Sequence, residues 1–90
     1  MTEYYVASFH NVSQALQFEK QLQTNKIDVK MIPVPRIISS SCGIAARFAL
    51  EDFSQVLSLL ETGVCEAQEL YLFTHKNKKA QAQRVWKAQD

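Results

Sequence analysis

The spacing of apolar residues changes along the chain, and each change predicts a new element. Residues 3–9 are rich in Tyr, Val and Phe, which is typical of a β-strand. In residues 12–24 the apolar side chains fall on one side of a helical wheel, which predicts an amphipathic helix. Asn11 is a candidate N-cap for this helix, and Gln14 is its candidate capping-box partner. The predicted apolar face consists of Val12, Ala15, Leu16, Phe18 and Leu22.

Two further strands follow the first helix. Residues 28–34 predict a second strand, and Pro33 and Pro35 place it at an edge of the sheet because each removes a backbone donor. Residues 43–50 alternate between apolar and small or charged side chains, which predicts a third strand with one buried face.

Asp52 begins a second amphipathic segment, and Gly63 stands where the C-terminus of a helix favours a positive φ. Residues 68–74 then predict a fourth strand. The resulting order, β-α-β-β-α-β, is that of an α+β, ferredoxin-like fold. We therefore expect residues 1–75 to form a two-layer domain, in which two helices cover one face of a four-stranded antiparallel sheet.

Residues 76–90 differ in charge from the rest of the chain. This tail has five Lys and Arg against one acidic residue, whereas residues 1–75 have five against eight. The asymmetry marks the tail as a separate unit, for which we expect a short helix or a disordered end. We do not expect nucleic acid as a partner, except through weak phosphate contacts of the basic residues. These are Lys76, Lys78, Lys79, Arg84 and Lys87.

The composition of the chain and its apolar runs indicate the cellular compartment in which we expect the protein. With 47% apolar and 21% charged residues, the chain has the composition of a globular protein. No apolar run approaches the roughly 18–20 residues that span a bilayer, and no signal peptide is recognisable. We therefore expect a cytoplasmic protein without membrane contact, in which Cys42 and Cys65 are reduced thiols.

The segment 32–43 contains both prolines, one of the two glycines and one of the two cysteines. In the expected fold it lies at the same end of the sheet as His10 and the N-terminus of the first helix. We expect Cys42 to be exposed there, where the helix N-terminus, Arg36 and His10 favour its thiolate. The other candidate binding residues, which offer hydroxyl donors or a close backbone approach, are Ser39, Ser40, Ser41 and Gly43.

A structural role for Cys42 is equally compatible with the sequence, because a free cysteine is often a small buried hydrophobe. Cys65 follows the helix-ending Gly63 in an ordinary turn, so a structural role is its simpler interpretation. No C-x₂-C or H-x₃-H pair joins these cysteines to His10 or His75, so we expect no metal site and no other cofactor.

The aromatic residues of the first and fourth strands leave the orientation of the sheet open, because both faces of these strands are apolar. An uncovered aromatic face would favour a homo-oligomer. One face carries Tyr5, Phe9, Tyr71 and Phe73, and the other carries Tyr4, Val6, Leu70 and Leu72.

The segment IPVPRIISSSCGIAARF, preceded by ALQFEKQL, resembles the selenium/sulfur carrier protein-like family over about residues 4–74. The resemblance implies that Cys42 carries sulfur or selenium, as a persulfide or selenosulfide, between a donor protein and an acceptor protein. It implies a carrier rather than a turnover enzyme. The matching residues are Ala15, Leu16, Glu19, Lys20, Ile32, Pro33, Pro35, Arg36, Ser39, Ser40, Cys42, Gly43, Ala45 and Arg47.

Two other functions fit the same residues. One is an interaction or small-molecule-binding module in which Cys42 is incidental. The other is a thiol-dependent enzyme with a Cys42–His10 dyad, although only Asn11 is at hand to orient the imidazole. A 90-residue domain also has little room for a substrate cavity.

Overall fold

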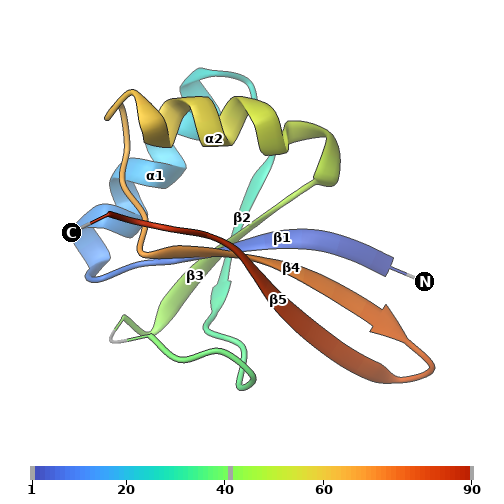
Figure 1. The fold of residues 1–90 in the computed structure, drawn as a ribbon. Helices are drawn as coiled ribbons and strands as arrows, with labels where there is room; N and C mark the ends of the chain where they lie inside the picture. Colours follow the sequence, from blue (N-terminus) through green and yellow to red (C-terminus); the bar gives the residue numbers. More distant parts are fainter. Residues whose placement is uncertain (1, 41, 90) are drawn as a thin grey trace.

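The computed structural model describes residues 2–40 and 42–89 and has an α+β architecture (Figure 1). Its five strands form one antiparallel sheet in the order β2-β3-β1-β4-β5. Both helices lie on the same side of this sheet (Figure 1). The elements are β1 (Thr2–Ser8), α1 (Val12–Thr24), β2 (Val29–Pro33), β3 (Ile44–Phe48), a 3₁₀ turn (Leu50–Asp52), α2 (Phe53–Glu61), β4 (Glu69–Lys76) and β5 (Lys79–Lys87).

The N-terminus of α1 has the predicted cap. The Asn11 Oδ1 atom accepts a hydrogen bond of 2.9 Å from the Gln14 backbone, and the Gln14 Oε1 atom accepts one of 2.9 Å from the backbone N–H of His10. The predicted apolar face was wrong for Val12 and Leu16, whose side chains are more than half exposed. The buried residues of α1 are Ala15, Phe18 and Leu22.

The predicted edge position of β2 is confirmed, because this strand pairs only with β3 among the described strands. The end of α2 is also as predicted. Gly63 follows the helix with a φ of +78°, a conformation that costs glycine little because it has no Cβ.

The tail departs from the prediction, because it forms a fifth strand rather than a helix or a disordered end. β5 pairs with β4 from Lys79 to Lys87, so the predicted four-stranded sheet was one strand short. The turn between the two strands consists of Asn77 and Lys78, both of which have a positive φ. Two consecutive left-handed residues produce the twist that a two-residue β-hairpin requires.

Each face of the sheet has its own apolar cluster. The helix-side cluster includes Tyr5, Phe9 and Leu70, whereas Tyr4 and Phe73 belong to the cluster on the open face, which the helices do not cover. Neither grouping of aromatic residues considered from the sequence was therefore correct. The reason is the β1–β4 register, which sets Tyr4 opposite Phe73 and Tyr5 opposite Leu72 and so gives each pair a common face.

Candidate functional site

The connection between β2 and β3, here named the Cys42 loop (residues 34–43), covers part of the open face. It leaves β2 on the side of the sheet opposite the helices (Figure 1). Its turn is closed by a hydrogen bond of 3.2 Å from the Ile38 N–H to the Pro35 carbonyl. The Ile38 side chain is 8% exposed and packs in the open-face cluster with Val6 and Phe73.

Ser40 attaches the far end of the loop to the end of β1. Its Oγ atom donates a hydrogen bond of 2.8 Å to the Phe9 carbonyl and accepts one of 3.2 Å from the Cys42 N–H. The loop therefore lies beside the segment that leads into α1, as the connectivity predicted.

The predicted exposure of Cys42 was wrong. Its side chain is 4% exposed and belongs to the helix-side cluster, together with Phe9 and Phe18. Ile38 is held on one face of the sheet, and Ser40 is held at the end of β1. The chain therefore crosses the end of the sheet between these residues, and the sulfur enters the core on the other side.

The remaining candidates do not surround the sulfur. Arg36 and Ser39 are exposed, and no hydrogen bond or ion pair joins either of them to Cys42 among the described residues. Gly43 has space for a Cβ, with no atom within 4 Å, so no close backbone approach requires glycine there. His10 lies on the surface at the entrance to α1, and Ser41 lies outside the described residues.

The second cysteine lies in the connection from α2 to β4, here named the Cys65 turn (residues 62–68). Cys65 is 2% exposed, and burial, together with the negative charge of Glu66, raises the pKa of its thiol to about 11. Glu66 is held toward α1 by a hydrogen bond of 3.0 Å from the Gln14 side-chain amide. A pocket of about 400 Å³ lies beside this turn, and Cys65, Glu66, His10 and Trp86 are among its lining residues.

His75 lies at the opposite end of the sheet, as predicted. It pairs with Thr2 at the start of β1, and its ring is hydrogen bonded to the Tyr4 hydroxyl at 2.6 Å. Within residues 2–40 and 42–89, no three potential metal-ligating side chains gather in one place.

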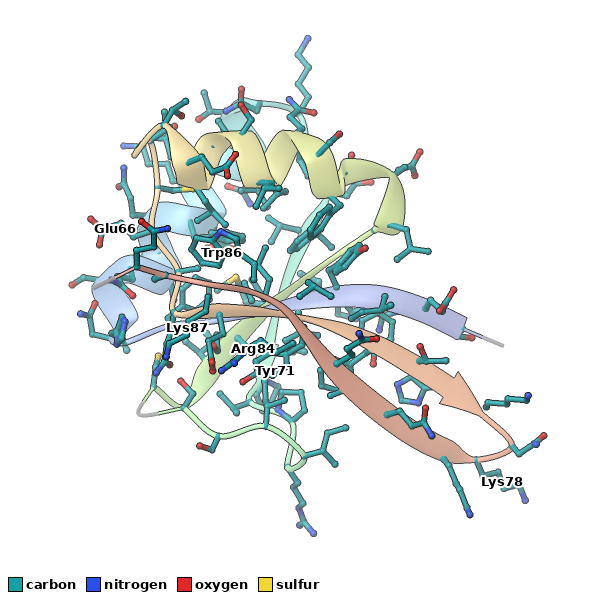
Figure 2. All side chains as sticks on the ribbon, in the orientation of Figure 1. Glu66, Tyr71, Lys78, Arg84, Trp86 and Lys87 are labelled. Atoms are coloured by element: carbon teal, nitrogen blue, oxygen red, sulfur yellow. The ribbon has the colours of Figure 1, made fainter. Side chains whose placement is uncertain are left out.

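A bulge in β5 places Arg84 and Trp86, which are two residues apart, on opposite faces of the sheet. Trp86 pairs with Leu70 and Arg84 with Tyr71, so Val85 is an extra residue in β5. Trp86 consequently packs against the helix-side cluster, while Arg84 lies on the opposite face of the sheet (Figure 2).

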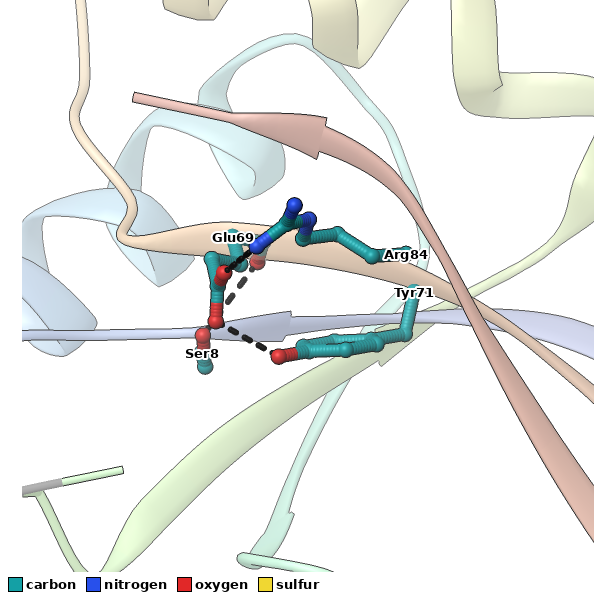
Figure 3. Close-up of polar contacts among 4 residues, drawn as sticks. All are labelled: Ser8, Glu69, Tyr71 and Arg84. Carbon is teal, nitrogen blue, oxygen red and sulfur yellow. Dashed lines mark hydrogen bonds and ion pairs between the residues drawn. The ribbon is translucent and has the colours of Figure 1, made fainter. Parts of the chain in front are cut away.

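Sequence reasoning missed the polar cluster that the bulge makes possible (Figure 3). The Glu69 carboxylate accepts hydrogen bonds from the Tyr71 hydroxyl at 2.5 Å and from Arg84 at 2.9 Å. Ser8, fully buried beside it, donates to the Glu69 carbonyl at 3.4 Å. The cluster fastens β5 to β4. Glu69 and Tyr71 are two residues apart on a predicted strand, so the sequence could have suggested a hydrogen bond between them on one face. Arg84 could not be placed beside them, because no strand was predicted in the tail.

These contacts shift the pKa values of both Tyr71 and Glu69. Burial raises the pKa of the Tyr71 hydroxyl to about 12, and the Glu69 carboxylate contributes as hydrogen-bond acceptor and as charge. Burial alone would raise the pKa of Glu69, but the hydrogen bonds from Tyr71 and Arg84 and the charge of Arg84 outweigh it and lower this pKa. Both groups are thereby kept in the protonation states that the hydrogen bond needs, a neutral phenol and a carboxylate.

Comparison with known proteins gives one match. The family described as Putative Se/S carrier protein-like matches residues 4–72, a range that includes both cysteines and the whole Cys42 loop. Searches of curated proteins and of solved structures found no match. Neither helix of the described chain is long and apolar enough to cross a membrane.

Proposed function

Because the chain belongs to the selenium/sulfur carrier protein-like family, we propose that it carries sulfur or selenium on Cys42. The observation that supports this proposal is the family match across residues 4–72, which includes the predicted segment from Pro35 to Gly43. The location of the loop adds support, because Ser40 holds Cys42 beside the end of β1, at a connection between strands rather than in the middle of an element.

The transfer is a thiol exchange at sulfur. The Cys42 thiolate attacks the terminal sulfur of a persulfide on the donor protein, and a new S–S bond forms at Cys42. The S–S bond of the donor breaks, and its cysteine leaves as a thiolate. An acceptor thiolate removes the terminal sulfur from Cys42 in the same way, so no external oxidant is consumed. A perselenide donor would leave a selenosulfide on Cys42.

Access to the thiol requires the Cys42 loop to open. Ser40 keeps it closed, because its hydroxyl is engaged with Phe9 and Cys42. In the open loop we assign Arg36, Ser39, Ser41 and His10 to stabilising the charged terminal atom, and Gly43 to backbone adjustment. The donor and acceptor are proteins of the cytoplasm, where thiols stay reduced.

We also assign the four strands β1 to β4 and the two helices to a ferredoxin-like plan. In this assignment β5 is an addition to that plan, attached beside β4.

Mass spectrometry tests the carrier function. The protein is incubated with a cysteine desulfurase and cysteine, and the peptide containing Cys42 should gain the mass of one sulfur atom. Cys65→Ser should load equally, whereas Cys42→Ser should not load. Loading of the Cys65 peptide alone, or no loading of either peptide, contradicts the proposal.

A second function, an interaction module in which Cys42 is structural, is favoured by one observation. The side chain of Cys42 is 4% exposed within an apolar cluster, as expected of a core cysteine. In this case Cys42→Ser lowers stability because it buries a hydroxyl, while Cys42→Ala retains every partner interaction of the parent protein.

A further inference from the structure

The two edges of the sheet differ in length and chemistry. β2 has five residues and ends at Pro33, so it offers little for another strand to pair with. β5 has nine residues, contains neither proline nor glycine, and is exposed along most of its length. An edge strand presents unpaired backbone N–H and C=O groups, and these can accept an additional strand.

The β5 edge is also basic. Lys76, Lys78 and Lys79 surround the hairpin turn, and Lys87 lies at the other end of β5; Figure 2 shows Lys78 and Lys87 at opposite ends of the strand. No acidic side chain is within ion-pair distance of these four lysines in the described part of the chain. Residues 76–89 contain no Asp or Glu; among the acidic residues of other segments, Glu69 pairs with Arg84 of β5, and Glu66 lines a pocket together with Trp86 and Ala88.

We propose that the outer edge of β5 binds an extended, acidic segment of a partner protein, which adds to the sheet as a sixth strand. Backbone hydrogen bonds supply the pairing, and carboxylates at the two ends of the segment meet the lysines. The charge selects this occupant, because two β5 edges from copies of this chain would bring like charges together.

The β5 edge is held in an extended conformation before a segment binds. β5 is aligned by its register with β4, by Trp86 in the helix-side cluster and by the ion pair between Arg84 and Glu69. A strand held in this way loses little conformational freedom when a segment binds, so more of the interaction energy appears as affinity. None of these contacts involves Cys42, and the inference therefore stands apart from the carrier function.

Single-stranded nucleic acid fits the edge less well. Its phosphates would contact the lysines, but its binding depends on aromatic side chains on which bases stack. The aromatic residue of β5 is Trp86, which packs against the core rather than lying on the outer edge.

A peptide tests the proposal with the full chain. The probe is a nine-residue peptide with blocked ends that alternates Glu with Val or Thr, at low ionic strength. We expect saturable binding, with NMR shifts of backbone amides concentrated in β5. N-methylation of the peptide at one alternate set of positions should weaken binding by about 100-fold or more, because several backbone hydrogen bonds of about fivefold each are lost together. Methylation at the other set should have little effect, because only alternate residues of an added strand pair with the edge.

Charge variants provide the matched control. Replacing both Lys79 and Lys87 by Gln should weaken binding several-fold, because two exposed ion pairs are lost. Replacing Lys20 and Lys30, which lie on α1 and β2, by Gln should leave binding unchanged. Circular dichroism checks that both variants fold, and Cys42→Ser should bind like the parent chain.

Four outcomes overturn the inference. They are no saturable binding, equal weakening by both methylation sets, tighter binding of a single-stranded oligonucleotide than of the peptide, and self-association of the chain through β5. Sulfur loading of Cys42 is measured separately, so failure here does not count against the carrier function.

Discussion

The Cys42 loop and the Cys65 turn each bury a thiol at a connection between elements, but different contacts keep the two thiols buried. The Cys65 turn is bracketed by backbone hydrogen bonds on both sides, from Val64 N to the Leu59 carbonyl at 3.0 Å and from Gln68 N to the Ser8 carbonyl at 2.7 Å. Beside Cys42, the Ser40 hydroxyl makes the connection to the end of β1, and on the other side a backbone hydrogen bond of 3.3 Å joins Val34 N to the Gly43 carbonyl. Equal burial therefore does not imply equal accessibility to a partner, because the two connections differ in what must break before the thiol emerges.

The largest expected difference concerns the ionisation of Cys65. Its pKa of about 11 lies two units above the ordinary value of 9.0, so its thiolate should be about 100-fold less populated at pH 8 than that of a free thiol. The ¹³Cβ chemical shift of Cys65, followed against pH, should show a midpoint near 11.

The raised pKa of Cys65 also makes the stability of the fold depend on pH. Because the thiol ionises less readily in the folded chain, the buried neutral thiol contributes fully to the free energy of unfolding below about pH 9. This contribution is lost as the pH rises through about 11. Glu66→Gln, which removes the smaller cause, should lower the midpoint only in part. A Cys65 midpoint near 9 would contradict the role of burial.

A smaller effect is expected where the Cys42 loop is attached. Ser40→Ala removes the hydroxyl that bonds to Phe9 and Cys42, and this should favour local opening by about 1 kcal/mol. In a Cys65→Ser background, alkylation of Cys42 should become about fivefold faster. Ser39 is an exposed neighbour for which no hydrogen bond is found among the described residues, so Ser39→Ala is the control and should alkylate at the parent rate. Equal rates in the two variants would show that Ser40 does not hold the loop.

The smallest expected effect is a difference in stability between alanine substitutions at the two glycines. Gly63→Ala should destabilise the fold by about 1 kcal/mol, because the new Cβ would occupy a left-handed conformation. Gly43→Ala should change the free energy of unfolding by less than about 0.5 kcal/mol, because a Cβ meets no atom there. Urea titration measures both, and a loss at Gly43 as large as that at Gly63 would contradict this account.

Local patterns predicted the first four strands and both helices because each has a strong period and a recognisable start or stop. Asn11 and Gln14 marked the start of α1, and Gly63 marked the end of α2. β5 was missed because its Ala, Gln and Lys residues favour helix in isolation, whereas pairing with β4 determines its structure. The turn at Asn77 and Lys78 lacks the glycine that usually signals a tight hairpin.

The candidate site was predictable in position but not in orientation. Connectivity alone brought the Cys42 loop to the end of β1, and Ser40 reaches Phe9 there. Ile38 packs in the open-face cluster, whereas Cys42, four residues later, packs in the helix-side cluster. A tertiary contact of this kind has no periodic signature in the sequence.

The bulge at Val85 has a consequence for how the last strand tolerates change. One additional residue lets Arg84 and Trp86 face opposite sides of the sheet, where a regular strand would turn both the same way. Without the bulge, the two side chains would share one face of the sheet. Either the Trp86 indole would leave the core, or the Arg84 guanidinium would lose its contact with the Glu69 carboxylate. The spacing between these two anchors is fixed by the geometry of a single irregularity.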